Sequence, residues 1–221
     1  MKYSWRRRAW IRSLILFLSL ECSTCFGSSP SDTSGRSPAA SQLINLTEER
    51  FHDLSAAEAK LVEAVADGTD ADCTKFTGKD RTIRSDLLSW LCVNPGAAAQ
   101  ITSQGVSILG AEIEGVLNLE WTKISFPLRT RQCVFTGAII LRNSRLAVLD
   151  LEDTSAKAIE GEGLIAEYGV FLRHGFRAEG GVDLRNARDV LASTQSYCSS
   201  SAVTISVESI SVMRSSIRWM W

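Results

Sequence analysis

Histidine, a side chain that can bind metals and transfer protons, is scarce in this sequence: its 221 residues include only His52 and His174. A metal site built from imidazoles needs more histidines than that. Glu160, Glu162 and Glu167 precede His174 and could form a carboxylate site beside it. Glutamates on a folded surface are more often solvated charges. We therefore interpret His174 as a surface histidine and expect no cofactor.

Three aspartates lie close together in the segment DGTDADC, which invites a calcium interpretation. They are Asp67, Asp70 and Asp72. An EF-hand loop requires a glycine at its sixth position and a glutamate at its twelfth. Counted from Asp70, those positions hold Lys75 and Arg81. The sequence therefore predicts a solvated loop at a helix end here, and no metal site.

No motif of nucleophilic or acid–base catalysis is complete. The segment GVSILG, residues 105–110, holds a serine between glycines, but its spacing differs from the G-x-S-x-G turn of serine hydrolases. A polysaccharide-active enzyme would need carboxylates and a basic group together on one sheet face. The candidates are Glu112, Glu114, Glu120 and Lys123. They form no recognisable motif, so we expect no catalytic residue and keep the enzyme as the alternative.

The first 27 residues have the composition of an export signal. Five basic side chains within residues 1–12 precede the apolar stretch 13–20, and small residues follow up to Gly27, where a signal peptidase would cleave. A membrane-spanning helix needs about 20 apolar residues, so we expect no transmembrane span. We expect a periplasmic or secreted protein. The alternatives are a twin-arginine signal, a lipid anchor on Cys22 or Cys25, and an uncleaved anchor.

Export also bears on the six cysteines, because an oxidising compartment permits disulfides. Two of the six leave with the signal, and Cys73, Cys92, Cys133 and Cys198 remain. Four cysteines allow three complete pairings. We single out Cys73–Cys92 as the candidate bridge. Cys92 and Cys133 lie among apolar neighbours and are also consistent with buried free thiols.

The charge of the remaining chain excludes two classes of partner. Residues 28–221 have 19 basic and 24 acidic side chains, a net charge of −5. A surface of that sign lacks the positive field that attracts nucleic acid or an anionic membrane. The same charge is too small for an acidic mimic of nucleic acid, and export argues against that role as well.

A helical region is predicted between a linker and the second half of the chain. Residues 28–45 form a Ser/Pro-rich linker, and residues 46–100 form the helical region. Ser55 and Glu58 have the spacing of a capping box, which starts one helix. A second helix over residues 82–92 has an apolar stripe formed by Ile83, Leu87, Trp90 and Leu91, and Asn94-Pro95 ends it.

A short apolar repeat replaces the helical spacing from about residue 101. Gly105, Gly110 and Gly115 stand five residues apart, and pairs of apolar residues recur about every ten residues. Such a repeat buries its apolar side chains only when successive coils stack on one another. The sequence therefore predicts a β-solenoid over residues 101–188, with core positions at Leu119, Ile139, Leu141, Leu146, Leu151 and Leu184.

Three segments carry a known five-residue pattern, namely VSILGAEIEGVLNL, FTGAIILRNSRLAVLDL and GGVDLRNAR. With them, this part of the chain resembles the pentapeptide-repeat proteins in a degenerate form. Ala138-Ile139, Leu146, Leu151 and Ala187 fit the small and leucine positions of that repeat. The segment RTIRSDLLSWLCVNP is similar to the helix that precedes such solenoids in bacterial proteins. The resemblance implies a mainly β fold, a right-handed quadrilateral β-solenoid of about four coils after a short two-helix cap, and no catalytic residue.

The last part of the chain, residues 189–221, breaks the repeat and is rich in serine. Its segment 203–207 alternates between apolar and polar residues, which predicts a strand. Open coil ends expose strands that can pair with another chain. We therefore count a homodimer through the solenoid ends among the candidate partners.

These observations lead to two hypotheses on function. The first is an exported, non-enzymatic solenoid that serves as a scaffold or as a module binding a protein or a polymer of the cell envelope. The alternative is a polysaccharide-active β-helix enzyme of the cell envelope or exterior. A cluster of acidic, basic or histidine side chains in one groove would favour the enzyme.

Overall fold

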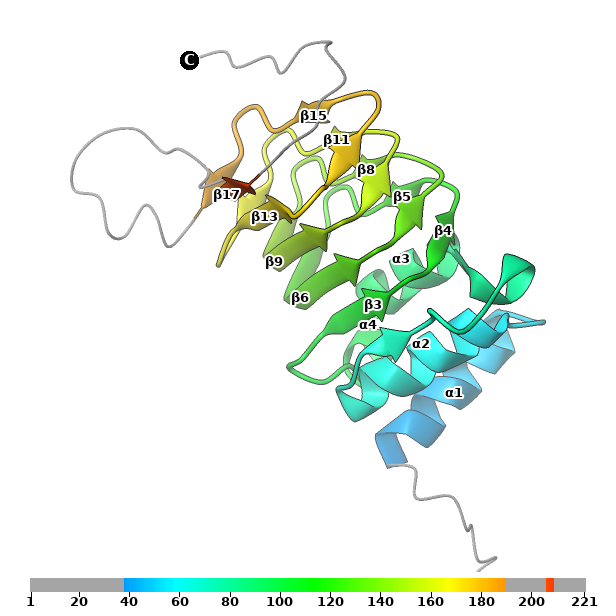
Figure 1. Cartoon of the computed structure of the whole chain (residues 1–221). Coiled ribbons are helices and arrows are strands. Elements are labelled where there is room, and N and C mark those ends of the chain that lie inside the picture. Colours follow the sequence, from blue (N-terminus) through cyan, green and yellow to red (C-terminus); the bar gives the residue numbers. More distant parts are fainter. Residues whose placement is uncertain (1–37, 190–205, 209–221) are drawn as a thin grey trace, which may run out of the picture. The chain divides into compact units, whose positions relative to one another are not determined.

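The computed structural model describes residues 38–189 and 206–208. Within them, four helices precede a stack of about four coils built from short parallel strands (Figure 1). The predicted mainly β solenoid of about four coils is thereby confirmed, but four helices stand where we expected two. The predicted signal, Cys22, Cys25 and Cys198 lie outside the described residues.

Helices α1 (Pro38–Arg50) and α2 (Ala56–Asp67) pack against each other at the N-terminal end of the coils. Because α1 begins at Pro38, residues 38–45 are helical, although we expected them to belong to the linker. The predicted capping box starts α2: Glu58 N donates to Ser55 Oγ, and Ser55 N donates to the Glu58 carboxylate, both at 3.0 Å. Gly68, with φ of 72°, ends this helix in the left-handed conformation.

The chain then contributes two strands to the solenoid before the next helices, α3 (Ser85–Val93) and α4 (Pro95–Ala98). These are β1 (Ala71–Asp72) and, after the 3-10 helix η1 (Gly78–Arg81), β2 (Thr82–Arg84). Ile83 therefore lies in a strand, not in the predicted helix, because β2 pairs with the first coil and sets Ile83 beside Ile113. Along α3, Leu87 and Leu91 are buried and Trp90 is partly buried.

The strands of the coils are short, apart from β6 and β9. In chain order they are β3 (Val106–Leu109), β4 (Glu112–Glu114), β5 (Leu117–Asn118), β6 (Lys123–Arg131), β7 (Val134–Phe135), β8 (Ile139–Ile140), β9 (Arg145–Glu152), β10 (Ser155–Ala156), β11 (Ile159–Glu160), β12 (Ile165–Ala166), β13 (Val170–Arg173), β14 (Arg177–Ala178), β15 (Val182–Asp183), β16 (Arg188–Asp189) and β17 (Ser206–Glu208). Strand β17 overlaps the predicted strand 203–207 and pairs in parallel with β13.

Each coil has four sides. The first side contains β3, the second halves of β6 and β9, and β13, whereas the second and third sides are the sheets β2-β4-β7-β10-β14 and β5-β8-β11-β15. The fourth side contains the first residues of β6 and β9 together with β12 and β16. A register shift between Ile124 and Pro127 marks the corner within β6. Between successive coils, from β3 to β16, paired residues are 20 to 23 positions apart, as in Ile139 with Ile159 and Ile159 with Val182.

Apolar side chains fill the coils in columns. On each side, two inward residues alternate with outward ones, so that the same sites of successive coils lie one above another. On the second side the first inward column is Ala111, Cys133, Thr154 and Phe176, and the second is Ile113, Phe135, Ala156 and Ala178. The predicted core residues Leu119, Ile139, Leu141, Leu146 and Leu151 are buried, and Leu184 of the last coil is partly buried.

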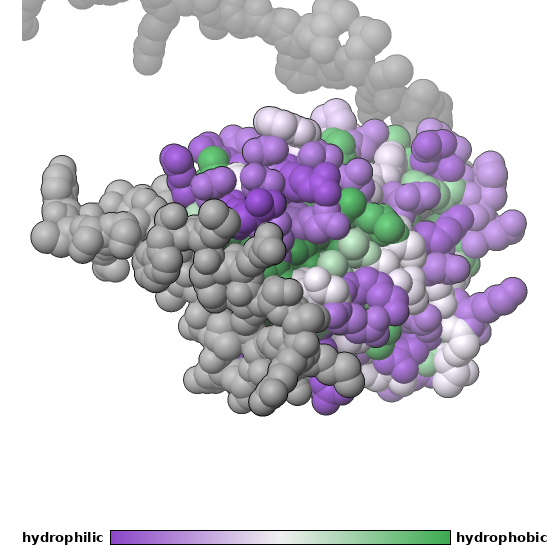
Figure 2. All heavy atoms as spheres, turned by 90° about the horizontal axis from the view of Figure 1, so that it is seen from above, coloured by the Kyte–Doolittle hydropathy of each residue, from purple (hydrophilic) through white to green (hydrophobic). Residues whose placement is uncertain are grey.

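The last coil presents part of its core at the end of the stack. Ala178, Val182 and Leu184 are only partly buried there. Figure 2, which views the structure from above, shows an area of apolar surface next to hydrophilic residues. Among the described residues, no helix is long and apolar enough to span a bilayer.

Candidate ligand-binding groove

An open groove of about 960 Å³ lies where the helices meet the first coil. Three segments of the chain line it: residues 50–51 at the end of α1, residues 84–95 from the end of β2 to the start of α4, and residues 118–122 from the third side of the first coil to its corner. Its lining residues are Arg50, Phe51, Arg84, Asp86, Ser89, Trp90, Val93, Asn94, Pro95, Asn118, Glu120 and Thr122. The groove therefore combines aromatic, cationic, carboxylate and amide groups.

Phe51 and Trp90 form the aromatic wall of the groove. Their ring centroids are 5.6 Å apart with an angle of 75° between the planes, which is the edge-to-face geometry that aromatic pairs prefer. The guanidinium carbons of Arg50 and Arg84 lie 5.7 and 5.5 Å from the centroid of Phe51. These cation–π contacts hold positive charge at the aromatic wall.

Glu58 fixes the position of Arg84. Arg84 donates from Nε to Oε1 at 2.7 Å and from Nη2 to Oε2 at 2.9 Å, and its backbone N donates to Oε1 at 2.9 Å. Desolvation raises the pKa of the buried Glu58 carboxyl, but the hydrogen bonds from Arg84 and Ser55 outweigh it and lower the pKa. One buried carboxylate thus joins the start of α2 to the groove wall.

Two asparagines supply hydrogen-bond donors to the groove. The side-chain oxygen of Asn94 accepts from Ala97 N, and that of Asn118 accepts from Glu120 N, each at 3.0 Å. These contacts occupy the oxygens and leave the amide NH₂ groups without a hydrogen bond to any described residue. The groove also has carboxylates at Asp86 and Glu120, so it offers donors and acceptors to a polar ligand.

Trp121 stands at the corner between Glu120 and Thr122, two residues that line the groove. It is 74% exposed and adopts a left-handed backbone conformation with φ of 58°. The equivalent corners of the next three coils hold Asn143, Gly163 and Asn186, also with positive φ. Asparagine and glycine adopt this conformation readily, whereas a bulky residue is strained in it. The fold thus holds an exposed indole in a strained position beside the groove.

No protein family matches this chain, and neither does any curated protein or solved structure. The function must therefore be inferred from the coil geometry and the groove.

The carboxylates that we considered for catalysis do not come together. Glu112 and Glu114 lie on β4 of the second side, Glu120 follows β5 on the third side, and Lys123 begins β6 on the fourth. Glu120 lines the groove and lies 4.0 Å from Arg142. These four residues therefore do not form the arrangement that the polysaccharide-active alternative would require.

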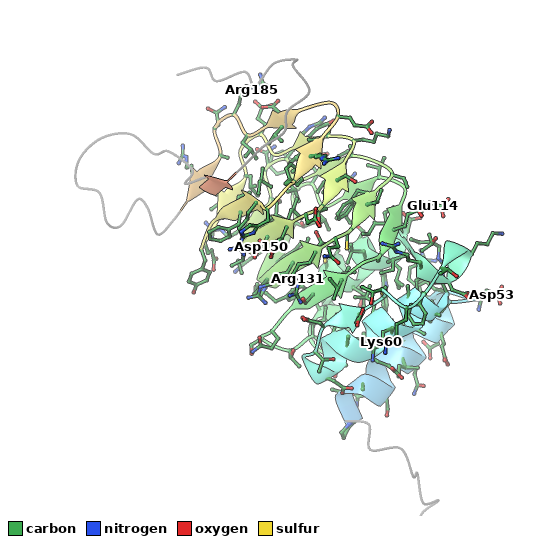
Figure 3. The ribbon with its side chains drawn as sticks, viewed as in Figure 1. Asp53, Lys60, Glu114, Arg131, Asp150 and Arg185 are labelled. Atoms are coloured by element: carbon green, nitrogen blue, oxygen red, sulfur yellow. The ribbon has the colours of Figure 1, made fainter. Side chains whose placement is uncertain are left out.

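The other residues that we considered, His174, Asp70 and Asp72, are exposed, and each contacts a neighbouring group. Nδ1 of His174, which is 54% exposed, lies 3.3 Å from the carboxylate of Glu152. Asp70 pairs with Arg131, and Asp72 accepts a hydrogen bond from the backbone N of Thr74 at 3.0 Å. Figure 3 shows Arg131 near Asp150 on the first side, away from Glu114. In the described parts of the chain, no three His, Cys, Asp or Glu side chains gather closely enough to bind a metal ion.

Cys73, Cys92 and Cys133 are buried free thiols, so the predicted Cys73–Cys92 bridge is not formed. Cys73 follows β1 beside the coils, whereas Cys92 lies on α3, so the fold places them on separate elements. Burial raises the pKa of Cys73 to about 11 and that of Cys92 to about 12. Burial likewise raises the pKa of Cys133. These thiols pack as small apolar side chains.

Proposed function

We propose that this chain is an exported, non-enzymatic binding module of the pentapeptide-repeat type. The assignment to that repeat is supported by the two inward residues on each of the four sides and by the 20 to 23 residues in each coil. We propose right-handed winding of the coils as part of the same assignment. The basic N-terminus and the apolar stretch that follows it support export.

The observation that carries the binding function is the groove with its exposed aromatic neighbour. It is open to the surface and not enclosed, which suits a segment of a polymer better than a small molecule that needs enclosure. Hydrogen bonds and ion pairs hold its walls, so little ordering is required when a ligand binds. A polymer of the cell envelope is the partner that fits these properties.

Affinity electrophoresis tests this proposal. The purified chain is run through gels that contain dextran, laminarin, polygalacturonate or alginate, and we expect retardation by at least one of them. The variant Arg50→Gln/Asp86→Asn removes two groove charges without changing the net charge, and it should lose the retardation. The matched control is Lys79→Gln/Asp80→Asn, an exposed pair in η1 outside the groove.

The same samples separate a binding module from an enzyme. We expect no new reducing ends after the chain is incubated with a polymer that retards it. Release of reducing ends would favour the polysaccharide-active alternative, with Asp86 and Glu120 as the carboxylates to substitute first. Mobility that no polymer changes would overturn the proposed function.

A further inference from the structure

The fourth side carries a column of cations that begins next to the groove. Lys123 of β6 pairs in register with Arg145 of β9, Arg145 with Ile165 of β12, and Ile165 with Arg188 of β16. Neighbouring strands lie about 4.8 Å apart, so Lys123 and Arg145 are one strand spacing apart and Arg145 and Arg188 two. Thr122 lines the groove and directly precedes Lys123, so the column continues from the groove wall.

These three cations differ from most other basic residues of the coils. Arg131, Arg142, Lys157, Arg173 and Arg185 each form an ion pair with a carboxylate. Among the described residues, no carboxylate forms an ion pair with any of the three cations of the column, although all three are exposed.

The surroundings of the column add one carboxylate and one aromatic ring. Glu167 lies two residues beyond Ile165 on the same strand face, and it is partly buried. Trp121 precedes Lys123 by two residues and exposes its ring at the corner. The column therefore offers positive charges one and two strand spacings apart, with one flat aromatic surface at its groove end.

We propose that Trp121, Lys123, Arg145 and Arg188, together named the basic edge, bind an acidic glycan, a sugar polymer with one carboxylate per monomer. This inference rests on the proposed function and names its ligand class. The apolar face of a sugar ring stacks on the indole of Trp121, and successive carboxylates pair with the cations of the column. The remaining hydroxyl groups meet the donors and acceptors of the groove.

Charge and spacing favour this ligand over other polyanions. The chain beyond residue 27 has a net charge of −5, so a polyanion must be held by local contacts with the cations of the column and not by the net charge of the chain. Three cations over three strand spacings match a polymer of moderate charge density. An acidic peptide would use the cations but has no requirement for an exposed indole beside them.

The test compares polygalacturonate with its methyl ester, which has the same backbone but no free carboxylates. We expect the acid form to bind the purified chain about tenfold more tightly than the ester, with an affinity that falls as salt is added. Poly-glutamate and single-stranded DNA are run in parallel, and both should bind more weakly than polygalacturonate.

Two sets of variants locate the interaction. Lys123→Gln/Arg145→Gln should weaken binding of polygalacturonate about tenfold. The matched control Lys157→Gln/Arg177→Gln removes the same charge from exposed residues of the second side and should leave binding unchanged. Trp121→Asn places a residue suited to the left-handed corner, so it should fold at least as stably and still lose affinity, whereas Trp121→Phe should retain most of it.

Each outcome separates this inference from the proposed function. Equal binding of acid and ester, or full binding by Lys123→Gln/Arg145→Gln, overturns the basic edge while the groove proposal stands. Tighter binding of poly-glutamate or DNA than of polygalacturonate rejects the glycan as ligand class. Retardation by none of the polymers rejects both proposals.

Discussion

At the scale of single residues, Glu58 is the charge on which the helical region depends most. It is 2% exposed, it completes the capping box of α2, and it receives three hydrogen bonds from Arg84. A carboxylate whose pKa is lowered on folding stabilises the protein above its unfolded pKa, and that stability is lost as the pH falls through the folded pKa. Glu58 therefore contributes at neutral pH and not in strong acid.

We predict that Glu58→Gln lowers the free energy of unfolding by about 2 kcal/mol at neutral pH. This loss is smaller than the usual cost of breaking a fully buried ion pair, because the side chain of Arg84 is 41% exposed to solvent. The difference from wild type should shrink below about pH 4. Urea unfolding at both pH values measures it, with the exposed Glu112→Gln as control. An equal loss at both pH values would show that the charge of Glu58 is not the cause.

Gly137 lies at a close approach between two coils. A Cβ atom there would lie 2.2 Å from the carbonyl oxygen of Gly115 and 2.8 Å from Val116 N, both backbone atoms of the preceding coil. We predict that Gly137→Ala destabilises the protein by about 2 kcal/mol, because the two coils must separate locally. Thermal unfolding measures the effect. Gly96→Ala is the control, since its Cβ would meet only side chains.

At the scale of elements, α3 covers the N-terminal end of the coils through Leu87 and Leu91, which are fully buried. We predict that Leu87→Asp unfolds or aggregates the protein, because a charge cannot be solvated at that site. The milder Leu87→Ala should cost about 3 kcal/mol. Size-exclusion chromatography and melting curves check both. Val93→Asp, at a half-exposed position of the same helix, should remain soluble with an unchanged melting curve.

The elements also show what could be predicted from sequence. The five-residue spacing predicted the stacked coils, and the capping box predicted the start of α2, because both patterns are local. Ile83 was misplaced because its strand depends on pairing with Ile113, which lies 30 residues further along the chain. A β-branched residue in a short apolar run is compatible with a strand as well as a helix.

The groove could not be predicted in the same way, since its walls come from three separate segments. Phe51 meets Trp90 only after α1 and α3 have packed. The basic edge, however, left a signal in the sequence. The segments LEWTK, LRNSR and LRNAR each begin at an inward leucine and end at a cation of the column. When these three segments are aligned, Lys123, Arg145 and Arg188 occupy the same position. Trp121 then stands where the other two segments have Asn143 and Asn186.

At the scale of the whole described fold, a stack of coils transmits stability only between neighbours. Strands of the two middle coils have partners on both sides, whereas β14, β15 and β16 have a described partner on one side only. We predict that amide hydrogen exchange is slowest in β6 and β9 and fastest in β14 to β16. Uniform protection along the coils would contradict this. Pairing of two copies through the coil ends stays a prediction.

The inward columns of the second side hold side chains of different size in different coils, which limits whether one coil can be duplicated, deleted or replaced by another. In one coil the bulky inward side chain is Phe135, in the second column. Two coils later it is Phe176, in the first column, and the second column holds the small Ala178. Duplicating or deleting one coil would set mismatched volumes against each other at the new junction. The coils are therefore not modular units, and an engineered longer array would need redesigned core residues at every inserted boundary.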